Sequence, residues 1–375
     1  MRILHTSDWH IGRFLNSYSL IEDQVHFLNW LINLIKEEKV DVLIVAGDIY
    51  NTASPSASCV AVLDEFFSKV VLELKKKVLI VAGNHDSPEK LGFSSKMLEK
   101  SGFYIATTLD DVRTIKFFEE NFSVAITLLP FVTPAMVKEK QDLKISSFNE
   151  TIQFVLKKYM KNSLVGDFNL ICAHGLFLGS KQNELKTCDS EIEIGGCDVC
   201  DLGLFKDYSY VALGHLHSFQ QVFDNAFYSG SPIKYSVSEH SHKKRVILLE
   251  VLKGLDVIVK KINVDCLRDL VVKKGMFSEI MKQKSDDFVA IKLLDDEFII
   301  DPYSRLKKNY PNILEIEFLN LTLKTVQGFK VCKNKNETEL FKDFFKVVSG
   351  REINSVELRF FEETLKKVKL DEEKK

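Results

Sequence analysis

The stretch Val78-Leu-Ile-Val-Ala-Gly-Asn-His-Asp86 shows the pattern that decides the fold, in which a short apolar run leads into metal-binding side chains. Four other places show it: Ile3 to Ser7 before Asp8-Trp9-His10, Val42 to Ala46 before Gly47-Asp48, Leu170 to Ala173 before His174-Gly175, and Tyr210 to Leu213 before Gly214-His215-Leu216-His217. Parallel strands of an α/β sheet place such residues in a crevice at their carboxyl ends. These strand ends therefore predict one shared site.

The donors at these strand ends predict a centre for two divalent metal ions. The candidates are Asp8, His10, Asp48, Asn84, His174, His215 and His217. They are too many for one tetrahedral ion and fit two ions that share a bridging carboxylate. Imidazole, carboxylate and amide donors without thiolate favour Mn, Fe or Zn over a structural cysteine zinc site or an all-oxygen Ca or Mg cage.

A lone histidine at a strand end is usually a hydrogen-bonded structural residue. We expect that structural role for His5, His26, His240 and His242. His215 and His217 differ because they lie two residues apart after a glycine, so they can reach different metals of one pair.

The order of the motifs resembles that of a known superfamily. D-x-H, G-D, G-N-H-D, H-G and G-H-x-H, from Asp8 to His217, resemble the calcineurin-like metallophosphoesterases. The opening residues 1–12, the stretch 210–217 and Tyr228-Ser-Gly-Ser-Pro-Ile233 with Glu239 are similar to the SbcD family of DNA double-strand-break-repair nucleases. Leu267-Arg268-Asp269-Leu270 and Tyr310-Pro311-Asn312 extend this similarity over most of the chain.

The resemblance implies a role for each candidate. Asp8, His10 and His217 would hold one metal, Asn84, His174 and His215 the other, and Asp48 would bridge them. Two such metals activate a shared hydroxide that attacks phosphorus. His85 matches a non-ligand catalytic position that contacts the scissile phosphate and stabilises or protonates the leaving oxygen. Asp86 is expected to orient His85 or its loop rather than bind metal.

The resemblance also implies a function and partners. The expected enzyme is a Mn²⁺-dependent nuclease subunit of an SbcCD-type DNA repair complex, with 3′-to-5′ double-strand exonuclease activity and single-strand or hairpin endonuclease activity. Its partners would be DNA, an SbcC-like coiled-coil ATPase and a second copy of the chain, in a heterotetramer. The alternatives are a metallophosphoesterase acting on a small phosphodiester or phosphoprotein, and a metal-free scaffold, with which the complete ligand set conflicts.

Periodicity predicts an α/β fold whose strands alternate with helices at 24–38 and 56–74. The resemblance adds a second packed sheet, a two-sheet metallophosphoesterase sandwich flanked by helices, with 246–251 and 255–264 as late strands. Residues 1–264 would form this nuclease domain. Residues 265–325 are predicted to form a small α+β domain, with helices at 276–284 and 302–309 before strands at 288–294 and 313–321. The resemblance implies that this domain caps the nuclease site and helps to select DNA.

Residues 326–375 are predicted to form two amphipathic C-terminal helices, and the resemblance to the SbcD family implies that they bind the ATPase partner. Phe341, Phe344, Phe345 and Val348 lie on one apolar stripe, and Leu358, Phe361, Leu365 and Val368 lie on another. Asn336 and Asn354, each with a glutamate three residues later, are expected N-caps. Packing on the chain's own domain is the alternative for these stripes. For dimerisation, the resemblance points to helices beside the first motifs, such as residues 56–74.

Composition decides less. The 375 residues carry 51 basic and 53 acidic side chains, a net charge of −2, so any DNA contact must be local. Candidate phosphate contacts are Lys243-Lys244-Arg245, Arg305-Lys307-Lys308, and Lys333 with Lys335, although such clusters are usually solvated surface. The 7 cysteines lack a disulfide framework, and Cys197 with Cys200 lacks a second pair for zinc. We expect a cytoplasmic protein with no targeting segment or membrane span.

Overall fold

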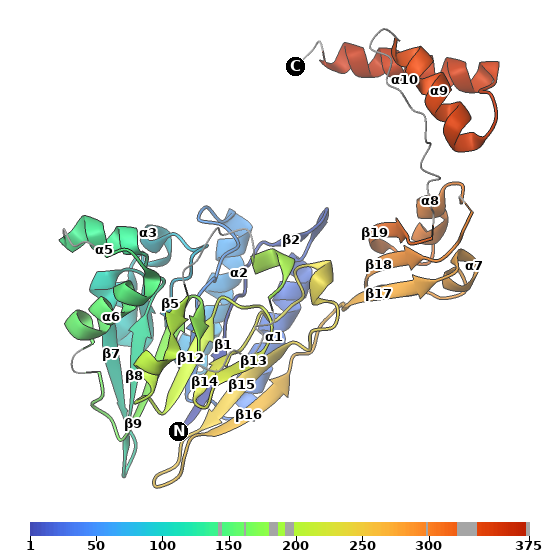
Figure 1. The fold of residues 1–375 in the computed structure, drawn as a ribbon. Coiled ribbons are helices and arrows are strands. Elements are labelled where there is room, and N and C mark those ends of the chain that lie inside the picture. The colour runs from blue at the N-terminus through green and yellow to red at the C-terminus, as the bar shows by residue number, and fades with distance from the viewer. Residues whose placement is uncertain are drawn as a thin grey trace. The chain divides into compact units, whose positions relative to one another are not determined.

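The computed structural model describes residues 1–141, 145–160, 163–179, 187–191, 199–297, 299–320 and 336–372. The chain forms two compact units. The first comprises Met1–Lys273, Met281–Ile291 and Tyr303–Ile316, and the second comprises Lys274–Ile280, Lys292–Pro302 and Glu317–Lys375. Figure 1 shows the chain coloured from its N-terminus to its C-terminus and labels most of its helices and strands.

The first sheet of the first unit contains three of the predicted strand ends. Its order is β16-β15-β1-β4-β5-β6. The strands are β16 (Ile258–Asn263), β15 (Arg245–Glu250), β1 (Arg2–Thr6), β4 (Val42–Ala46), β5 (Lys77–Val81) and β6 (Phe103–Ala106). Strands β1, β4, β5 and β6 are parallel, whereas β15 and β16 pair antiparallel at one edge. The predicted βαβ order is therefore confirmed.

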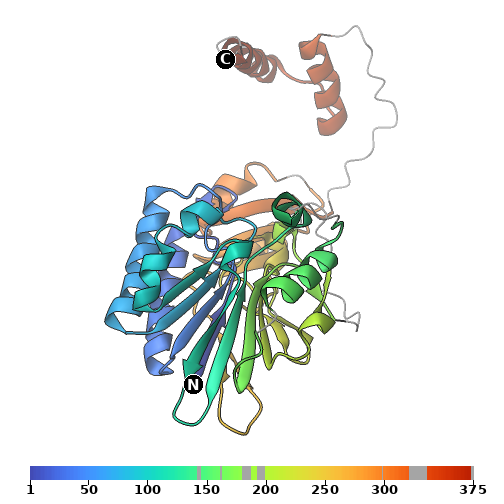
Figure 2. The same ribbon diagram turned by 90° about the vertical axis from the view of Figure 1, so that its left-hand side faces the viewer.

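The second sheet contains the other two strand ends. Its order is β13-β14-β12-β9-β8-β7. The strands are β13 (Gln220–Phe223), β14 (Ala226–Tyr228), β12 (Tyr210–Gly214), β9 (Phe168–His174), β8 (Ser123–Leu129) and β7 (Arg113–Phe118). Figure 2 shows the two sheets face to face with helices outside them. Apolar residues of both sheets, such as Ile44, Ile126 and Ala212, share one buried cluster, so the predicted two-sheet sandwich is confirmed.

Two further apolar clusters attach helices to the outer faces of the sandwich. Helices α1 (Ile21–Glu37) and α2 (Ala57–Ser68), which continues as a π-helical turn over Lys69–Glu73, pack on the first sheet. Helices α5 (Pro134–Gln141) and α6 (Phe148–Tyr159) supply Val137 and Ile152 to the cluster outside the second sheet. Burial on both faces explains why the strands that carry the motifs are almost continuously apolar.

The shorter elements lie between these strands or follow them. They are α3 (Pro88–Leu91), α4 (Ser95–Leu98), β2 (Phe14–Leu15), β3 (Tyr18–Ser19), β10 (Phe177–Leu178), β11 (Cys200–Asp201), β17 (Leu270–Gly275), α7 (Phe277–Ile280), β18 (Phe288–Leu293), α8 (Pro302–Lys307), β19 (Asn312–Phe318), α9 (Glu337–Ser349) and α10 (Ser355–Glu372). Strands β17, β18 and β19 form a three-stranded sheet in that order. None of the helices in the described ranges is long and apolar enough to cross a membrane.

After residue 264 one predicted helix is wrong in length, and one strand lies outside the predicted elements. The helix expected over 276–284 is only α7, because Asn309 binds the following loop: its Nδ2 donates to Met281 O at 2.7 Å, and its carbonyl accepts from Ser285 N at 3.2 Å. The sequence does not predict strand β17, since Leu270-Val-Val-Lys-Lys-Gly275 does not alternate clearly between apolar and polar residues. Cys197, Lys333 and Lys335 lie outside the described residues.

Candidate metal centre

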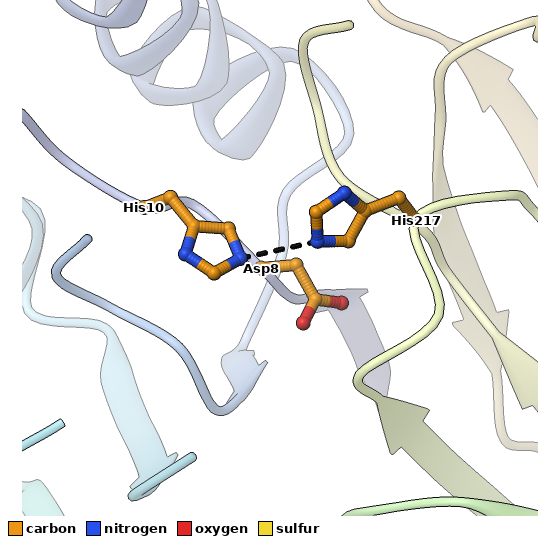
Figure 3. Close-up of side chains that lie close together, drawn as sticks. All are labelled: Asp8, His10 and His217. Carbon is orange, nitrogen blue, oxygen red and sulfur yellow. Dashed lines mark hydrogen bonds between the residues drawn. The ribbon is translucent and has the colours of Figure 1, made fainter. Parts of the chain in front are cut away.

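The seven predicted donors lie together at the carboxyl ends of β1, β4, β5, β9 and β12. His10 Nε2 lies 3.1 Å from His217 Nε2, and the carboxylate of Asp8 joins these two rings in one buried cluster. Figure 3 shows the three side chains converging from two separate segments of the chain. Asn84 Oδ1 lies 3.0 Å from His174 Nε2 and 3.1 Å from His215 Nδ1, which forms a second group.

Asp48 lies between these two groups. Its Oδ2 is 3.5 Å from His10 Nε2 and also 3.5 Å from His174 Nε2. Its other oxygen, Oδ1, accepts the backbone N–H of His85 at 3.0 Å. One carboxylate oxygen therefore faces both groups of donors while the other is fixed by the backbone.

Glycines allow the strand ends of the two sheets to approach this closely. A Cβ added to Gly83 would lie 2.1 Å from Asp48 Oδ1, and one added to Gly47 would lie 2.2 Å from His174 Nδ1. At Gly214 it would lie 1.8 Å from the carbonyl oxygen of Ala46, in the facing sheet. Glycine thus precedes the donors because a side chain there would occupy the space of the donors or of their backbone.

The backbone at the donors is strained. Asp8, His10, Asp48 and His215 have positive φ values of 54°, 44°, 52° and 116°. Such conformations cost about 1 to 3 kcal/mol each for residues other than glycine and concentrate at functional sites. The fold tolerates this cost where it turns side chains from different strands toward one point.

The electrostatics of the cluster suit cations. Burial and the charge of Asp48 raise the pKa of Asp8 well above its usual value. Burial also tends to raise the pKa of Asp48, but the polar groups that face its carboxylate, namely the His174 and His10 rings and the backbone N–H of His85, outweigh burial and lower that pKa. Burial lowers the pKa of His10 and His174, and lowers that of His215 to about 3, so these imidazoles are neutral and suited to bind metal.

One buried polar atom adds to this fit. Among the residues that the structure describes, His10 Nδ1 is buried without a hydrogen-bond partner. Neutral imidazoles and two carboxylates, whose ligand atoms lie within 4.8 Å of one another in each group, form a donor set that suits divalent cations. The residues present therefore fit the two ions expected from the sequence.

His85 stands beside the donors. Its Nδ1 lies 3.0 Å from Asn51 O, so Nδ1–H donates to that carbonyl and Nε2 is the acceptor. Its ring meets that of His10 edge to face, with centroids 4.8 Å apart. The ligand atoms of His85, His10 and Asp48 also lie within 4.8 Å of one another, so distance alone does not separate a catalytic His85 from a metal-binding one.

Asp86 holds the loop rather than the ring of His85. Its carboxylate accepts the backbone N–H groups of Ile49, Tyr50 and Gly83 at 3.1, 3.0 and 2.9 Å. These bonds tie the segment after β4 to the one after β5. Burial and Asp48 raise the pKa of Asp86 to about 7.

The four histidines expected to be structural lie outside this group of donors. His5 is buried between Tyr210 Oη at 3.0 Å and Leu213 O at 3.2 Å, and burial lowers its pKa to about 3. His26 lies 3.1 Å from Asp265, and His240 Nδ1 lies 3.1 Å from Val237 O. Burial lowers the pKa of His242 to about 4.

Lys244 is a wrong candidate for contacting DNA. Its side chain is 3% exposed, and Nζ donates to Glu239 Oε2 at 2.5 Å. Glu239 is fully buried, and although burial tends to raise its pKa, Lys244 and His217 lower it well below the usual value. Sequence reasoning missed this pair because a basic triplet and one distant glutamate carry no signal of mutual contact; the similarity around Glu239 was the only hint.

Comparison with known proteins agrees with this geometry. Residues 1–219 match the family model "Calcineurin-like phosphoesterase", and residues 266–349 match "Type 5 capsule protein repressor C-terminal domain". The first match spans more than half of the chain, and the protein belongs to the calcineurin-like phosphoesterases. This family uses divalent metals, and the structure supplies candidate residues to bind them.

Similarity to one known protein extends over nearly the whole chain. The SbcD component of nuclease SbcCD from Staphylococcus epidermidis (strain ATCC 12228 / FDA PCI 1200) is 29% identical over 369 residues, covering 95% of this chain and 96% of that protein. The expected similarity to the SbcD family is thus confirmed.

Two solved structures show a weaker likeness. A putative 5′-nucleotidase from Staphylococcus aureus matches with 15% identity and a TM-score of 0.39, over 72% of this chain and 55% of that one. A dimetal phosphatase from Danio rerio matches with 13% identity and a TM-score of 0.39, over 70% of this chain and 96% of that one.

Proposed function

We propose that this protein is the metal-dependent DNA nuclease subunit of an SbcCD-type repair complex. The observation that carries the proposal is the similarity to the SbcD component of a nuclease over 95% of the chain. It is combined with the position of Asp48, which lies 3.5 Å from a histidine of each donor group. The activities proposed are 3′-to-5′ exonuclease on duplex DNA and endonuclease on single strands or hairpins. The proposed location is the cytoplasm.

We assign Asp8, His10 and His217 to one cation, Asn84, His174 and His215 to the other, and Asp48 to both. Mn²⁺ is the proposed metal. When bound, two such ions supply a water nucleophile at neutral pH and neutralise charge on the phosphate. The protein holds the metal-binding side chains in place through the positive φ values at four of them and through the close approach of the strand ends. His85, held by Asn51 and Asp48, is assigned to the scissile phosphate and the leaving oxygen.

Parallel assays of the purified protein in Mn²⁺ test the substrate. One arm uses end-labelled linear and hairpin DNA, and the other uses a generic small phosphodiester, both with and without the ATPase. We expect cleavage of both DNA forms. Full turnover of the small ester without any DNA cleavage would instead favour the alternative function, a phosphoesterase acting on small phosphodiesters or phosphoproteins.

The domain boundaries are part of the proposal. Residues 1–264 would form the nuclease domain, 265–325 a domain that caps the site and selects DNA, and 326–375 the partner-binding helices. The match of a separate family model to residues 266–349 supports a division after the sandwich. Residues 321–335 lie outside the described part of the chain.

We propose that the C-terminal helices bind the coiled coil of the ATPase, and three features of the helical pair support this. Asn336 and Asn354 cap them as expected, accepting from Glu339 N at 2.9 Å and Glu357 N at 3.0 Å. Phe341 of α9 stacks on Phe361 of α10 with centroids 3.7 Å apart. A groove of about 510 Å³ on this helical pair is lined by Phe341, Phe345, Ile353, Val356, Phe360 and Phe361. Of these lining residues, Val356 and Phe360 are 76% and 73% exposed.

Changing both Val356 and Phe360 to aspartate is expected to weaken ATPase binding at least about 30-fold, because apolar anchors dominate such interfaces. Co-purification and calorimetry with the coiled-coil ATPase would measure the loss. The control is Leu164→Asp, since Leu164 is also exposed, by 49%, but lies beside the second sheet. Unchanged binding by the double variant, or by a chain ending at residue 325, would contradict this assignment.

A homodimer is proposed through α2 and the short helices α3 and α4. This face exposes Val60, Leu72, Phe93, Met97 and Leu98, with Phe93 and Met97 exposed by 79% and 75%. Val60, Leu72, Phe93 and Leu98 line one cavity of about 260 Å³, and exposed apolar residues that cluster in this way mark interfaces. Phe93→Asp with Met97→Asp should convert a dimer to a monomer in sedimentation experiments; a wild-type chain that sediments as a monomer at all accessible concentrations would count against it.

A further inference from the structure

His217 differs from His10 and His174 in having a buried carboxylate behind its ring. Its Nε2 faces His10, whereas Nδ1, on the other side of the ring, lies 3.4 Å from Glu239 Oε1. The other rings of the described centre have different partners. His174 Nδ1 lies 2.8 Å from the neutral carbonyl of Ala46, and His10 Nδ1 is buried with no partner among the described residues.

Glu239 is itself fixed from several directions. Oε1 accepts the backbone N–H of Tyr235 at 3.2 Å, Ser236 Oγ lies at 3.4 Å, and Cys188 Sγ lies at 3.5 Å. Oε2 accepts from Lys244. The side chains of Glu239 and Lys244 are 0% and 3% exposed, so water does not compete for these contacts.

Lys244 connects this carboxylate to the backbone of His217. Besides Glu239, its ammonium donates to Ser231 Oγ at 2.7 Å and to the carbonyl of His217 at 3.0 Å, so its three protons have three acceptors. The backbone N–H of His217 donates to Glu191 Oε1. The ring, carbonyl and N–H of one residue are thus held by side chains from separate segments.

We propose that the buried Glu239–Lys244 pair is a positioning device for metal loading, in which Glu239 accepts Nδ1–H of His217 and thereby presents the Nε2 lone pair to a divalent cation. A carboxylate behind a metal-binding imidazole fixes its tautomer and raises its basicity. Lys244 keeps the carboxylate in place and balances its charge. Glu239 is a positioning residue, and the inference rests on the proposed metal centre.

The first test needs no substitution. Long-range ¹H–¹⁵N correlation on the metal-free wild-type protein reports the histidine tautomers, and the His217 signals are assigned by their loss in His217→Gln. We expect a single tautomer with the proton on Nδ1. A proton on Nε2, or a mixture of both tautomers, would overturn the proposal.

The second test replaces the pair with neutral groups, in Glu239→Gln with Lys244→Met, so that no unpaired charge stays buried. Calorimetric titration of the full chain with Mn²⁺ should show one site weakened about 10- to 100-fold and the other unchanged. The control is Asp265→Asn, which removes the carboxylate beside the half-exposed His26. Unchanged affinity at both sites of the double variant would refute the positioning role while leaving the metal centre intact.

Two further outcomes are also decisive. If the wild-type chain takes up no Mn²⁺, the proposed metal centre fails, and the inference fails with it. If the double variant does not fold, Glu239→Asp provides the same measurement, because it keeps the charge but shortens the reach toward His217. It should then lower affinity at one site, and equal affinity at both sites would again contradict the role of Glu239.

Discussion

Asp48→Asn is expected to abolish phosphodiester hydrolysis, with turnover falling at least about 10³-fold, as when a principal electrostatic contact to the reacting group is lost. The reason is its position: one oxygen lies 3.5 Å from donors of both proposed metal sites. An amide oxygen retains the shape but lacks the charge that would hold two cations together. Steady-state cleavage of end-labelled DNA in Mn²⁺ would measure the change.

The matched control is Asp111→Asn. Asp111 accepts four hydrogen bonds from Thr107 and Thr108 at 2.9 to 3.1 Å, away from the donors. Its replacement should leave turnover unchanged. Asp48→Asn retaining more than a tenth of the wild-type rate would mean that Asp48 does not bridge the metals.

Removing the charge of Asp48 and removing the charge of Asp8 should change the stability of the metal-free protein in opposite directions. The pKa of Asp48 is lowered in the fold, so its ionised form stabilises the protein above the unfolded pKa of ~3.9, and this contribution is lost as the pH falls. The pKa of Asp8 is raised, so its ionised form destabilises the fold at neutral pH. Thermal unfolding at pH 7 without metal should therefore find Asp48→Asn less stable and Asp8→Asn more stable than wild type.

His85→Gln should separate metal binding from catalysis. We expect Mn²⁺ stoichiometry to stay at the wild-type value while turnover falls about 10²- to 10⁴-fold, the usual contribution of a positioned acid or base. The structure supports this division because Nδ1 of His85 is bound to Asn51 O and its backbone to Asp48. Elemental analysis beside the cleavage assay would measure both quantities.

His26→Gln is the control, since His26 lies near Asp265 and outside the donor group. One outcome would contradict the catalytic assignment of His85. Loss of one equivalent of Mn²⁺ in His85→Gln would make His85 a ligand, as its proximity to His10 and Asp48 permits.

The strand ends could be predicted from the sequence because their signal is local. Strands such as β4, Val42–Ala46, are buried on both faces, so every residue is apolar and the run stops where the donors begin. Periodicity likewise located α1, whose observed range Ile21–Glu37 differs from the expected 24–38 by a few residues. The start of this helix is hard to predict because its N-cap residue, Leu20, makes no side-chain hydrogen bond and so carries no capping signal in the sequence.

Two features of the site could not be predicted from the sequence because they depend on contacts between residues far apart in the chain. The equal approach of His10 and His174 to Asp48 requires two sheets to meet, and no pattern within one strand encodes it. The burial of Lys244 depends on Glu239 and Ser231 being folded around it. A basic residue in a basic triplet is ordinarily exposed, which is why the charge pattern suggested DNA contact there.

The most direct test of the two-metal centre is a crystal structure of the protein soaked in Mn²⁺, with anomalous scattering recorded at the manganese edge. The account predicts two peaks, one bound by Asp8, His10 and His217 and one by Asn84, His174 and His215, with Asp48 contacting both. A fully soaked crystal with no anomalous peak among these residues, or with a peak only at Cys188, His217 and Glu239, would contradict it.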